Sequence, residues 1–298
     1  ASTGPVISSA PQTSSSALST PMPSFLPAGA TGDPVLLAAG DISSCSSKGD
    51  YSTAQIINQY PDAVIATLGD TVYEQGSPTQ FENCFNPAWG AFKDRIHPAI
   101  GNHEYLTAKA AGYFGYFGPA AGSPSQGYYS YNLGSWHVVV INSNCSQVGG
   151  CGPGSPQEKW LQADLAAHPE KCTLAYWHHP RWSSGEHGDQ SQMQTIWADL
   201  YRAGADLVLS GHDHDYERFA PLDANGNPDP QNGIREFVVG TGGKNYYPIS
   251  AQIQPGSEVH QSDVFGVLKL TLHPDGYDWQ FLPEAGKTFS DSGSAQCH

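Results

Sequence analysis

The chain has 298 residues, a formal net charge of −15 at pH 7, and only 14% charged residues. This length is sufficient for one large domain with a buried core. The negative charge argues against a surface that binds nucleic-acid phosphates and against a polybasic membrane patch. No stretch reaches the roughly 18 consecutive apolar residues of a spanning helix, so we expect neither nucleic acid nor membrane among the partners.

The N-terminal segment differs in composition from the rest of the chain. It opens with Ala1-Ser2-Thr3, which we interpret as the start of a processed, secreted chain whose signal peptide has been removed. Residues 1–33 are rich in Ser, Thr, Pro and Ala and hold few large apolar groups. Such a segment cannot bury enough apolar surface to offset its ordering entropy. We therefore predict a flexible arm over residues 1–33 and a single folded domain over residues 34–298.

The six cysteines are an even number, which supports an oxidising compartment but allows 15 pairings. Cys145 and Cys151 bracket a short Gly-rich loop, and a bridge to Cys297 would hold down a terminus that otherwise frays. A cysteine metal site is the rival interpretation, but the sequence has no Cys-x-x-Cys pair. Among the possible pairings we favour Cys45 with Cys84, Cys145 with Cys151, and Cys172 with Cys297.

Apolar runs that end at a potential metal ligand recur along the chain. They cover residues 35–39, 62–68, 96–100, 172–177 and 205–210, and are followed by Asp41, Asp70, Asn102, His178, and His212 with His214. The carboxyl ends of strands are where open α/β sheets gather their ligands. His212 and His214 are two residues apart, so on an extended chain they project to the same side. The recurrence predicts a metal site, because imidazole nitrogens are the commonest metal ligands.

The remaining pattern predicts a strand-rich, layered α/β domain. Helices are expected from Ser155 to Leu165 and from Asp189 to Ala203, since apolar residues recur there at helical spacing. Further strands are expected over residues 136–141, 235–239, 264–272 and 277–281, the last two forming a hairpin. Gly240 to Lys244 lacks the spacing of a phosphate-binding loop, so we interpret it as a turn at a strand end near the cleft.

The motifs together resemble those of the calcineurin-like metallophosphoesterases. Within these enzymes, the tyrosine of the second motif makes the set similar to that of the purple acid phosphatases. They are Gly40-Asp41, Gly69-Asp70-Thr71-Val72-Tyr73, Gly101-Asn102-His103-Glu104, His178 after a strand, and Gly211-His212-Asp213-His214. The resemblance spans about Leu36 to Phe219 and implies a two-sheet β-sandwich core flanked by helices, a four-layer α/β/β/α fold. The N-terminal arm is too short for the extra β-sandwich domain of plant relatives, so we expect only the catalytic domain in this sequence.

The resemblance also implies two metal ions that share Asp70. Asp41, Asp70, Tyr73 and His214 would hold Fe(III), because carboxylate and phenolate oxygens suit a hard trivalent ion. Asp70, Asn102, His178 and His212 would hold a divalent ion, either Zn, Fe or Mn. The implied reaction is hydrolysis of phosphate monoesters by attack of a metal-bound hydroxide, with a small phosphorylated substrate and a monomeric enzyme.

Four residues near these ligands have expected roles outside the metal shell. By the resemblance, His103 would contact the phosphoryl or leaving-group oxygen and could supply a proton to it. His187, in a Gly- and Ser-rich loop, is a weaker candidate for a substrate contact, and His179 is expected to be structural. Glu104 either holds the His103 ring or is a solvated carboxylate.

Two other functions stay open at this point. A phosphodiesterase could use the same core, and a secreted binding protein could keep the scaffold without activity. All seven candidate ligands are intact in the sequence, which counts against the inactive scaffold.

Overall fold

The computed structural model describes residue 1 and residues 32–298. The predicted arm lies outside the described residues except for residues 1, 32 and 33. Among the described residues, no helix is both long enough and apolar enough to span a bilayer.

A six-stranded sheet forms one half of the core, in the order β15-β14-β13-β1-β3-β5. Strands β1, β3 and β5 are parallel, whereas β13, β14 and β15 are added antiparallel. The strands are β1 Val35–Ala39, β3 Val64–Leu68, β5 Ile96–Ala99, β13 Gly266–His273, β14 Gly276–Pro283 and β15 Ser292–Gln296. The predicted hairpin is confirmed, because His273 pairs with Gly276 at its tip.

A seven-stranded sheet forms the other half, in the order β12-β10-β11-β9-β8-β7-β6. Its central strands β7, β8, β9 and β11 are parallel. The strands are β6 Tyr129–Leu133, β7 Trp136–Val140, β8 Cys172–Tyr176, β9 Leu207–Ser210, β10 Tyr216–Phe219, β11 Arg235–Val239 and β12 Ser257–Gln261. A small two-stranded sheet pairs β2 Ser43–Ser44 with β4 Val72–Tyr73.

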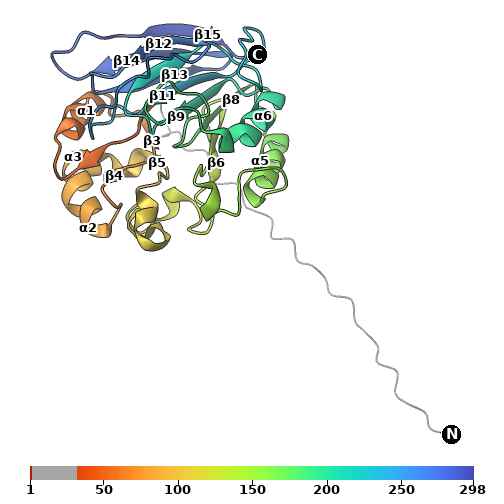
Figure 1. The fold of residues 1–298 in the computed structure, drawn as a ribbon, viewed down its shortest axis with the longest axis horizontal. Coiled ribbons are helices and arrows are strands. Elements are labelled where there is room, and N and C mark those ends of the chain that lie inside the picture. The colour runs from red at the N-terminus through yellow and green to blue at the C-terminus, as the bar shows by residue number, and fades with distance from the viewer. Residues whose placement is uncertain (2–31) are drawn as a thin grey trace.

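Helices cover the outer face of each sheet. Figure 1 shows α1, α2 and α3 on one side of the molecule and α5 and α6 on the other. The α-helices are α1 Gly49–Ile57, α2 Pro78–Gln80, α3 Asn86–Trp89, α4 Ala111–Phe117, α5 Pro156–Ala167 and α6 Gln194–Arg202. The other helical segments are η1 Phe81–Phe85, η2 Gly90–Arg95, η3 Glu104–Leu106, η4 Ala108–Ala110, η5 Gly118–Ala121, η6 Cys145–Gln147 and η7 Ser191–Met193.

Side-chain alternation along the strands explains the four layers. On β1, Leu36 and Ala38 pack into the core between the sheets, whereas Leu37 and Ala39 pack under α1 and α3. The second sheet repeats this pattern, with Val208 of β9 facing the helices α5 and α6. Successive strand residues point to opposite faces, so a strand buried on both faces is apolar throughout. The predicted four-layer α/β/β/α architecture is confirmed.

The predicted helices are present, with one different start. The Ser155 hydroxyl accepts the Glu158 N–H at 3.3 Å and caps α5. Helix α6, in contrast, begins at Gln194 rather than at Asp189, because the Asp189 carboxylate accepts the Ser183 N–H at 2.9 Å within a loop.

All six cysteines are paired, and the three pairings are those favoured from the sequence. The Cα–Cα distance is 4.9 Å for Cys45–Cys84, 5.1 Å for Cys145–Cys151 and 5.5 Å for Cys172–Cys297. These distances lie in the usual range for disulfides.

Candidate metal centre

The seven predicted metal ligands converge where the parallel strands of both sheets end. Asp41, Asp70 and Asn102 lie in the loops after β1, β3 and β5 of the six-stranded sheet. His178 follows β8, and His212 and His214 follow β9, in the seven-stranded sheet. Tyr73 lies on β4, three residues after Asp70. The site is therefore assembled from both sheets.

Asp41, Asp70, Tyr73 and His214 form the first cluster. The Tyr73 hydroxyl lies 2.7 Å from Asp41 Oδ1, 3.1 Å from Asp70 Oδ2 and 3.0 Å from His214 Nε2. Asn245 Nδ2 donates to a backbone carbonyl, so its Oδ1, 3.1 Å from His214 Nδ1, is an acceptor. His214 Nδ1 then carries the ring proton of the neutral imidazole, and the lone pair of Nε2 points at the cluster. One hydroxyl proton cannot satisfy so many acceptors, which is the arrangement a cation would complete.

Asp70, Asn102, His178 and His212 form the second cluster. His178 Nδ1 donates to the Leu68 carbonyl at 2.9 Å, so Nε2 faces the cluster. Burial lowers the pKa of His178, but the adjacent Asp70 outweighs burial and raises it to about 9, so a bound cation would take the place of the proton on Nε2. That Nε2 lies 3.0 Å from Asn102 Oδ1, 3.2 Å from His212 Nδ1 and 3.2 Å from Asp70 Oδ2. Electron-rich atoms that face one another in this way suit a bound cation. The hydrogen bond on the far side of the ring is the usual partner of a metal-binding histidine.

Asp70 is the residue that the two clusters share. Its Oδ2 faces both Tyr73 and His178, while its Oδ1 accepts the His103 N–H at 2.8 Å. Burial disfavours the charged form of Asp70, but the neighbouring His178 and His103 outweigh burial and hold its pKa below the usual range. Asp70 therefore lies between the two clusters.

The backbone at three of these positions is held in a rarely populated conformation. Asp41, Asp70 and His212 have φ angles of 59°, 44° and 72°. For a residue other than glycine, such a conformation costs roughly 1–3 kcal/mol. The glycines beside the ligands leave little room for a side chain, because a Cβ on Gly211 would lie 2.6 Å from Asp41 Oδ2 and one on Gly101 would lie 2.1 Å from Asp70 Oδ1. The Gly-Asp, Gly-Asn and Gly-His pairs in the sequence thus reflect close packing of the ligand loops.

Both roles predicted for Glu104 from the sequence are wrong. It is fully buried, and its carboxylate accepts the N–H groups of Thr71 at 2.8 Å, Val72 at 3.3 Å and Gly101 at 2.8 Å. It therefore joins the Asp70 loop to the Asn102 loop rather than holding the His103 ring or lying in solvent. Burial, followed by the charge of Asp70, raises the pKa of Glu104 to about 8.

His103 and His187 lie at the edge of the clusters. The His103 ring packs on Tyr73, with Nδ1 2.6 Å from the Glu74 carbonyl and Nε2 3.8 Å from Asp70 Oδ2. His187 lies 4.3 Å from the His212 ring, and its Nδ1 is 2.9 Å from Asp213 Oδ1. Both rings are partly exposed, with 25% and 37% of their side-chain surface accessible. Both candidates are thus placed where a substrate could reach them.

His179 is buried beneath these ligands, and its ring lies 4.4 Å from that of His212. Burial, together with the adjacent His178, lowers the pKa of His179 to about 3, so the ring is neutral. Its Nδ1 is 2.8 Å from the Ser143 hydroxyl. Its nitrogens also lie close enough to His178 and His212 for all three to approach one ion.

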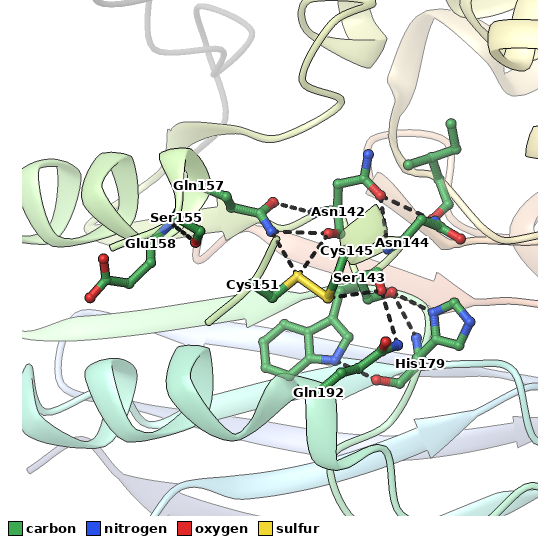
Figure 2. The surroundings of a disulfide bond; sticks show 12 residues. Asn142, Ser143, Asn144, Cys145, Cys151, Ser155, Gln157, Glu158, His179 and Gln192 are labelled. Atoms are coloured by element: carbon green, nitrogen blue, oxygen red, sulfur yellow. Dashed lines mark hydrogen bonds between the residues drawn. A yellow bond between two sulfur atoms is a disulfide. The ribbon is translucent and has the colours of Figure 1, made fainter. Parts of the chain in front are cut away.

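Figure 2 shows the Cys145–Cys151 disulfide beside Asn142, Ser143 and Asn144, where the Ser143 hydroxyl contacts His179. Gln157 fixes the preceding segment through two hydrogen bonds to the Asn142 backbone, at 2.8 and 3.0 Å. Asn144 Nδ2 donates to the carbonyl of Ile100 at 3.2 Å, and Ile100 lies two residues before the ligand Asn102. The disulfide loop thus braces the segments that carry His178 and Asn102.

Three residues that hold His187 or the ligand His214 had no role predicted from the sequence. Asp213 orients His187, Asn245 holds His214, and Tyr247 stacks on the His214 ring at 3.9 Å. Asn245 and Tyr247 follow Gly240–Lys244, which was predicted to turn near the cleft, and Lys244 N indeed donates to the Asp41 carbonyl at 3.0 Å. The signal for them was position alone: they lie close to a predicted motif or strand end.

Comparison with known protein families identifies a match over the larger part of the chain. The family described as calcineurin-like phosphoesterase matches residues 32–216, which include every predicted ligand.

Curated relatives include purple acid phosphatases of plants. Probable purple acid phosphatase 20 of Arabidopsis thaliana is 28% identical over 209 residues, covering 61% of this chain and 45% of the relative. Purple acid phosphatase 1 of Ipomoea batatas is 27% identical, covering 60% and 41%. The chain thus spans less than half the length of these relatives.

Solved structures share the fold. Purple acid phosphatase PPD1 from yellow lupin seeds aligns with a TM-score of 0.68 at 18% identity, covering 90% of this chain and 54% of the lupin chain. The Plasmodium protein described as GAP50, the anchor in the inner membrane complex, aligns with a TM-score of 0.67 at 15% identity, covering 90% of each chain.

Proposed function

The chain belongs to the calcineurin-like phosphoesterase family and resembles the purple acid phosphatases, and we propose that it is a secreted phosphatase with a binuclear metal centre that hydrolyses phosphate monoesters. The observation that carries the proposal is the position of Asp70 between two clusters of converging ligands. The buried, electron-rich atoms of each cluster fit a cation.

The donor atoms suit two different ions. Asp41, Asp70, Tyr73 and His214 offer hard oxygens that favour Fe(III), whereas Asn102, His178 and His212 with Asp70 suit a divalent Zn, Fe or Mn ion. Two such ions would acidify a water molecule and neutralise phosphoryl oxygens during in-line displacement. The protein's own contribution is a rigid shell, because hydrogen bonds on the side away from the cluster hold the rings of His178 and His214.

The partly exposed histidines are proposed to act on the substrate. His103 Nδ1 faces the Glu74 carbonyl, which fixes the ring so that Nε2 faces the centre and can hold a proton for the leaving oxygen. Asp213 holds the His187 ring next to the ring of His212, and His187 is proposed to bind the phosphoryl group from there. His179 is proposed to position His212 by packing.

An anchor without activity is the alternative that the fold itself permits, since GAP50 is described as an anchor. The complete set of ligands in this chain favours the enzyme, because an inactive scaffold has no need for strained, buried metal ligands. A phosphodiesterase would use the same ligands and differ only in the surrounding loops.

Compartment and partners complete the proposal. Three disulfides fit an oxidising compartment, which supports secretion. We propose a small phosphorylated substrate, which the metal ions rather than the acidic surface would attract, and a monomeric enzyme.

Elemental analysis with the visible absorption spectrum tests the centre. Two metals per chain including iron, with a visible band that disappears in Tyr73→Phe, would support the proposed ion assignment, since the band arises from tyrosinate bound to iron. Two metals without iron or colour would overturn the iron assignment and retain the binuclear hydrolase. A protein that takes up no metal would favour the inactive scaffold.

Turnover of p-nitrophenyl phosphate, compared with its bis-ester, separates monoesterase from diesterase. His212→Ala should abolish turnover while the fold is retained, whereas His260→Ala, an exposed histidine on β12, should leave turnover unchanged. Full activity in His212→Ala would contradict the metal assignment.

A further inference from the structure

A second group of histidines and carboxylates lies at the C-terminal end of α5. His137 is on β7, opposite Asn132 of the edge strand β6. Asp164 is in the last turn of α5 and His168 is its C-cap, so the two are four residues apart on one helix face. One ligand atom from each of His137, Asp164 and His168 lies within 4.8 Å of the others.

The hydrogen bonds of His137 leave one ring nitrogen facing a carboxylate. Asn132 Nδ2 donates to Glu170 Oε1 at 2.9 Å, which fixes Asn132 Oδ1 as the acceptor facing His137 Nδ1 at 3.1 Å. His137 Nδ1 therefore carries a proton. Its Nε2 lies 2.8 Å from Asp164 Oδ2, where a neutral ring would oppose a lone pair to a negative oxygen. Either a second proton or a cation must lie between them.

The surroundings supply more negative charge than one protonated His137 would balance. Asp164 Oδ1 is already satisfied by the Ser130 hydroxyl at 2.7 Å. Glu170 Oε1 lies 3.6 Å from His168 Nδ1, and Glu170 Oε2 is buried without a hydrogen-bond partner among the described residues. A buried, unpaired carboxylate oxygen is costly unless an ion or proton joins it.

The His168 ring is placed to complete a ligand set. It stacks on the His137 ring, with centroids 4.2 Å apart and an interplanar angle of 6°. Its side chain is 30% exposed and lies at the end of the helix, so it can turn toward a common ion and leaves a path from solvent.

We propose that His137, Asp164 and His168, with Glu170 as the fourth ligand, form a separate divalent-metal site selective for Zn²⁺. Two imidazoles and two carboxylates match the ligand types and the coordination number of protein-bound zinc. The Asn132 amide oxygen, which accepts the proton of His137 Nδ1, is the outer partner that such a histidine ligand requires. The ion would tie the β6–β7 hairpin to the end of α5.

This site is distinct from the catalytic centre. On β7, Val138 and Val140 face the core between the sheets, so His137 faces the helical layer instead. His137 also lies near the start of β7, where it pairs with Thr173, whereas the catalytic ligand His178 comes after the end of β8. No residue is shared between the two sites.

Zinc content of the full-length protein tests the site. The protein is dialysed against zinc at a buffered free concentration, and bound zinc per chain is counted by mass spectrometry in wild type, His168→Ala, Asp164→Asn and the control His260→Ala. We expect one zinc fewer in His168→Ala and Asp164→Asn than in wild type and control, with unchanged turnover of p-nitrophenyl phosphate. Asn132→Ala should retain the site with zinc affinity lower by about 10- to 100-fold.

Equal zinc content in wild type and in His168→Ala would overturn the site and leave His137 as a protonated partner of Asp164. A catalytic centre that binds no zinc would lower the count equally in all four proteins, so the difference of one zinc is read independently of the proposed function. Thermal unfolding in the presence of a chelator verifies that each variant is folded.

Discussion

The first prediction concerns Glu104, the last residue of the third motif, whose buried carboxylate joins the Asp70 loop to the Asn102 loop. Replacement by alanine removes the acceptor of three backbone N–H groups, two of which, on Thr71 and Gly101, are bonded at 2.8 Å. A buried polar group left unpaired costs about 1–3 kcal/mol, so the two close bonds alone predict a loss of roughly 2–6 kcal/mol. Because whole domains are stable by only about 5–15 kcal/mol, this loss is a large fraction of the total.

Urea unfolding in the presence of a chelator measures this loss without a contribution from bound metal. Glu104→Gln retains one acceptor oxygen and should lose less than Glu104→Ala, which keeps the test valid if the alanine variant does not fold. Glu82→Ala removes an exposed carboxylate on η1 and serves as the control. A change below about 0.5 kcal/mol in Glu104→Ala, the size typical of surface substitutions, would refute the role of Glu104 in joining the loops.

Two further predictions concern stability. A disulfide limits the entropy of the unfolded chain, and this effect grows with the length of the loop that it closes. Replacing Cys172 and Cys297, which are 125 residues apart, by serine should therefore destabilise the protein by ~5 kcal/mol, whereas replacing Cys145 and Cys151, which are 6 residues apart, should cost ~2 kcal/mol. Equal losses in urea unfolding would contradict this order. Burial raises the pKa of Glu236 from its ordinary value of 4.5 to about 8, so the folded state binds the extra proton between these values and stability falls as pH rises through them. Glu236→Gln should remove the contribution of Glu236 and leave that of Glu104, whose pKa burial also raises to about 8, so the slope should become shallower. Unfolding curves recorded across this pH range measure the slope, and an unchanged slope would contradict the contribution of Glu236.

The predictable part of the fold is the part in which sequence pattern and burial coincide. Val35–Ala39 is apolar throughout because both of its faces are covered, and the second half of Arg235–Val239 is apolar for the same reason. The structure has both strands at the predicted bounds. The edge strand β12 alternates between exposed and half-buried residues, and all of its side chains except Val259 are polar, so no apolar run marked it. Its place is decided by backbone pairing with β10, which local pattern does not encode.

The same division holds at the site. Asp70 and His212 were predictable because glycine and a strand end place them, and their motifs leave few alternatives. Glu104 was misread because its partners, Thr71 and Gly101, belong to two loops, and only the folded structure shows that their N–H groups point at one carboxylate. Asn245 could not be found because it reaches His214 from a loop 31 residues away.

The origin of the ligands in two different sheets has a mechanical consequence. Asp41 and Asn102 belong to loops of the six-stranded sheet and His178 to a loop of the seven-stranded sheet, while Asp70 contacts both groups. Cations bound among these ligands would link the loops of the six-stranded sheet to those of the seven-stranded sheet. Metal loading would then slow amide exchange at the adjoining ends of β5 and β8, so the ions that prepare the reaction would also keep the two halves of the molecule closed.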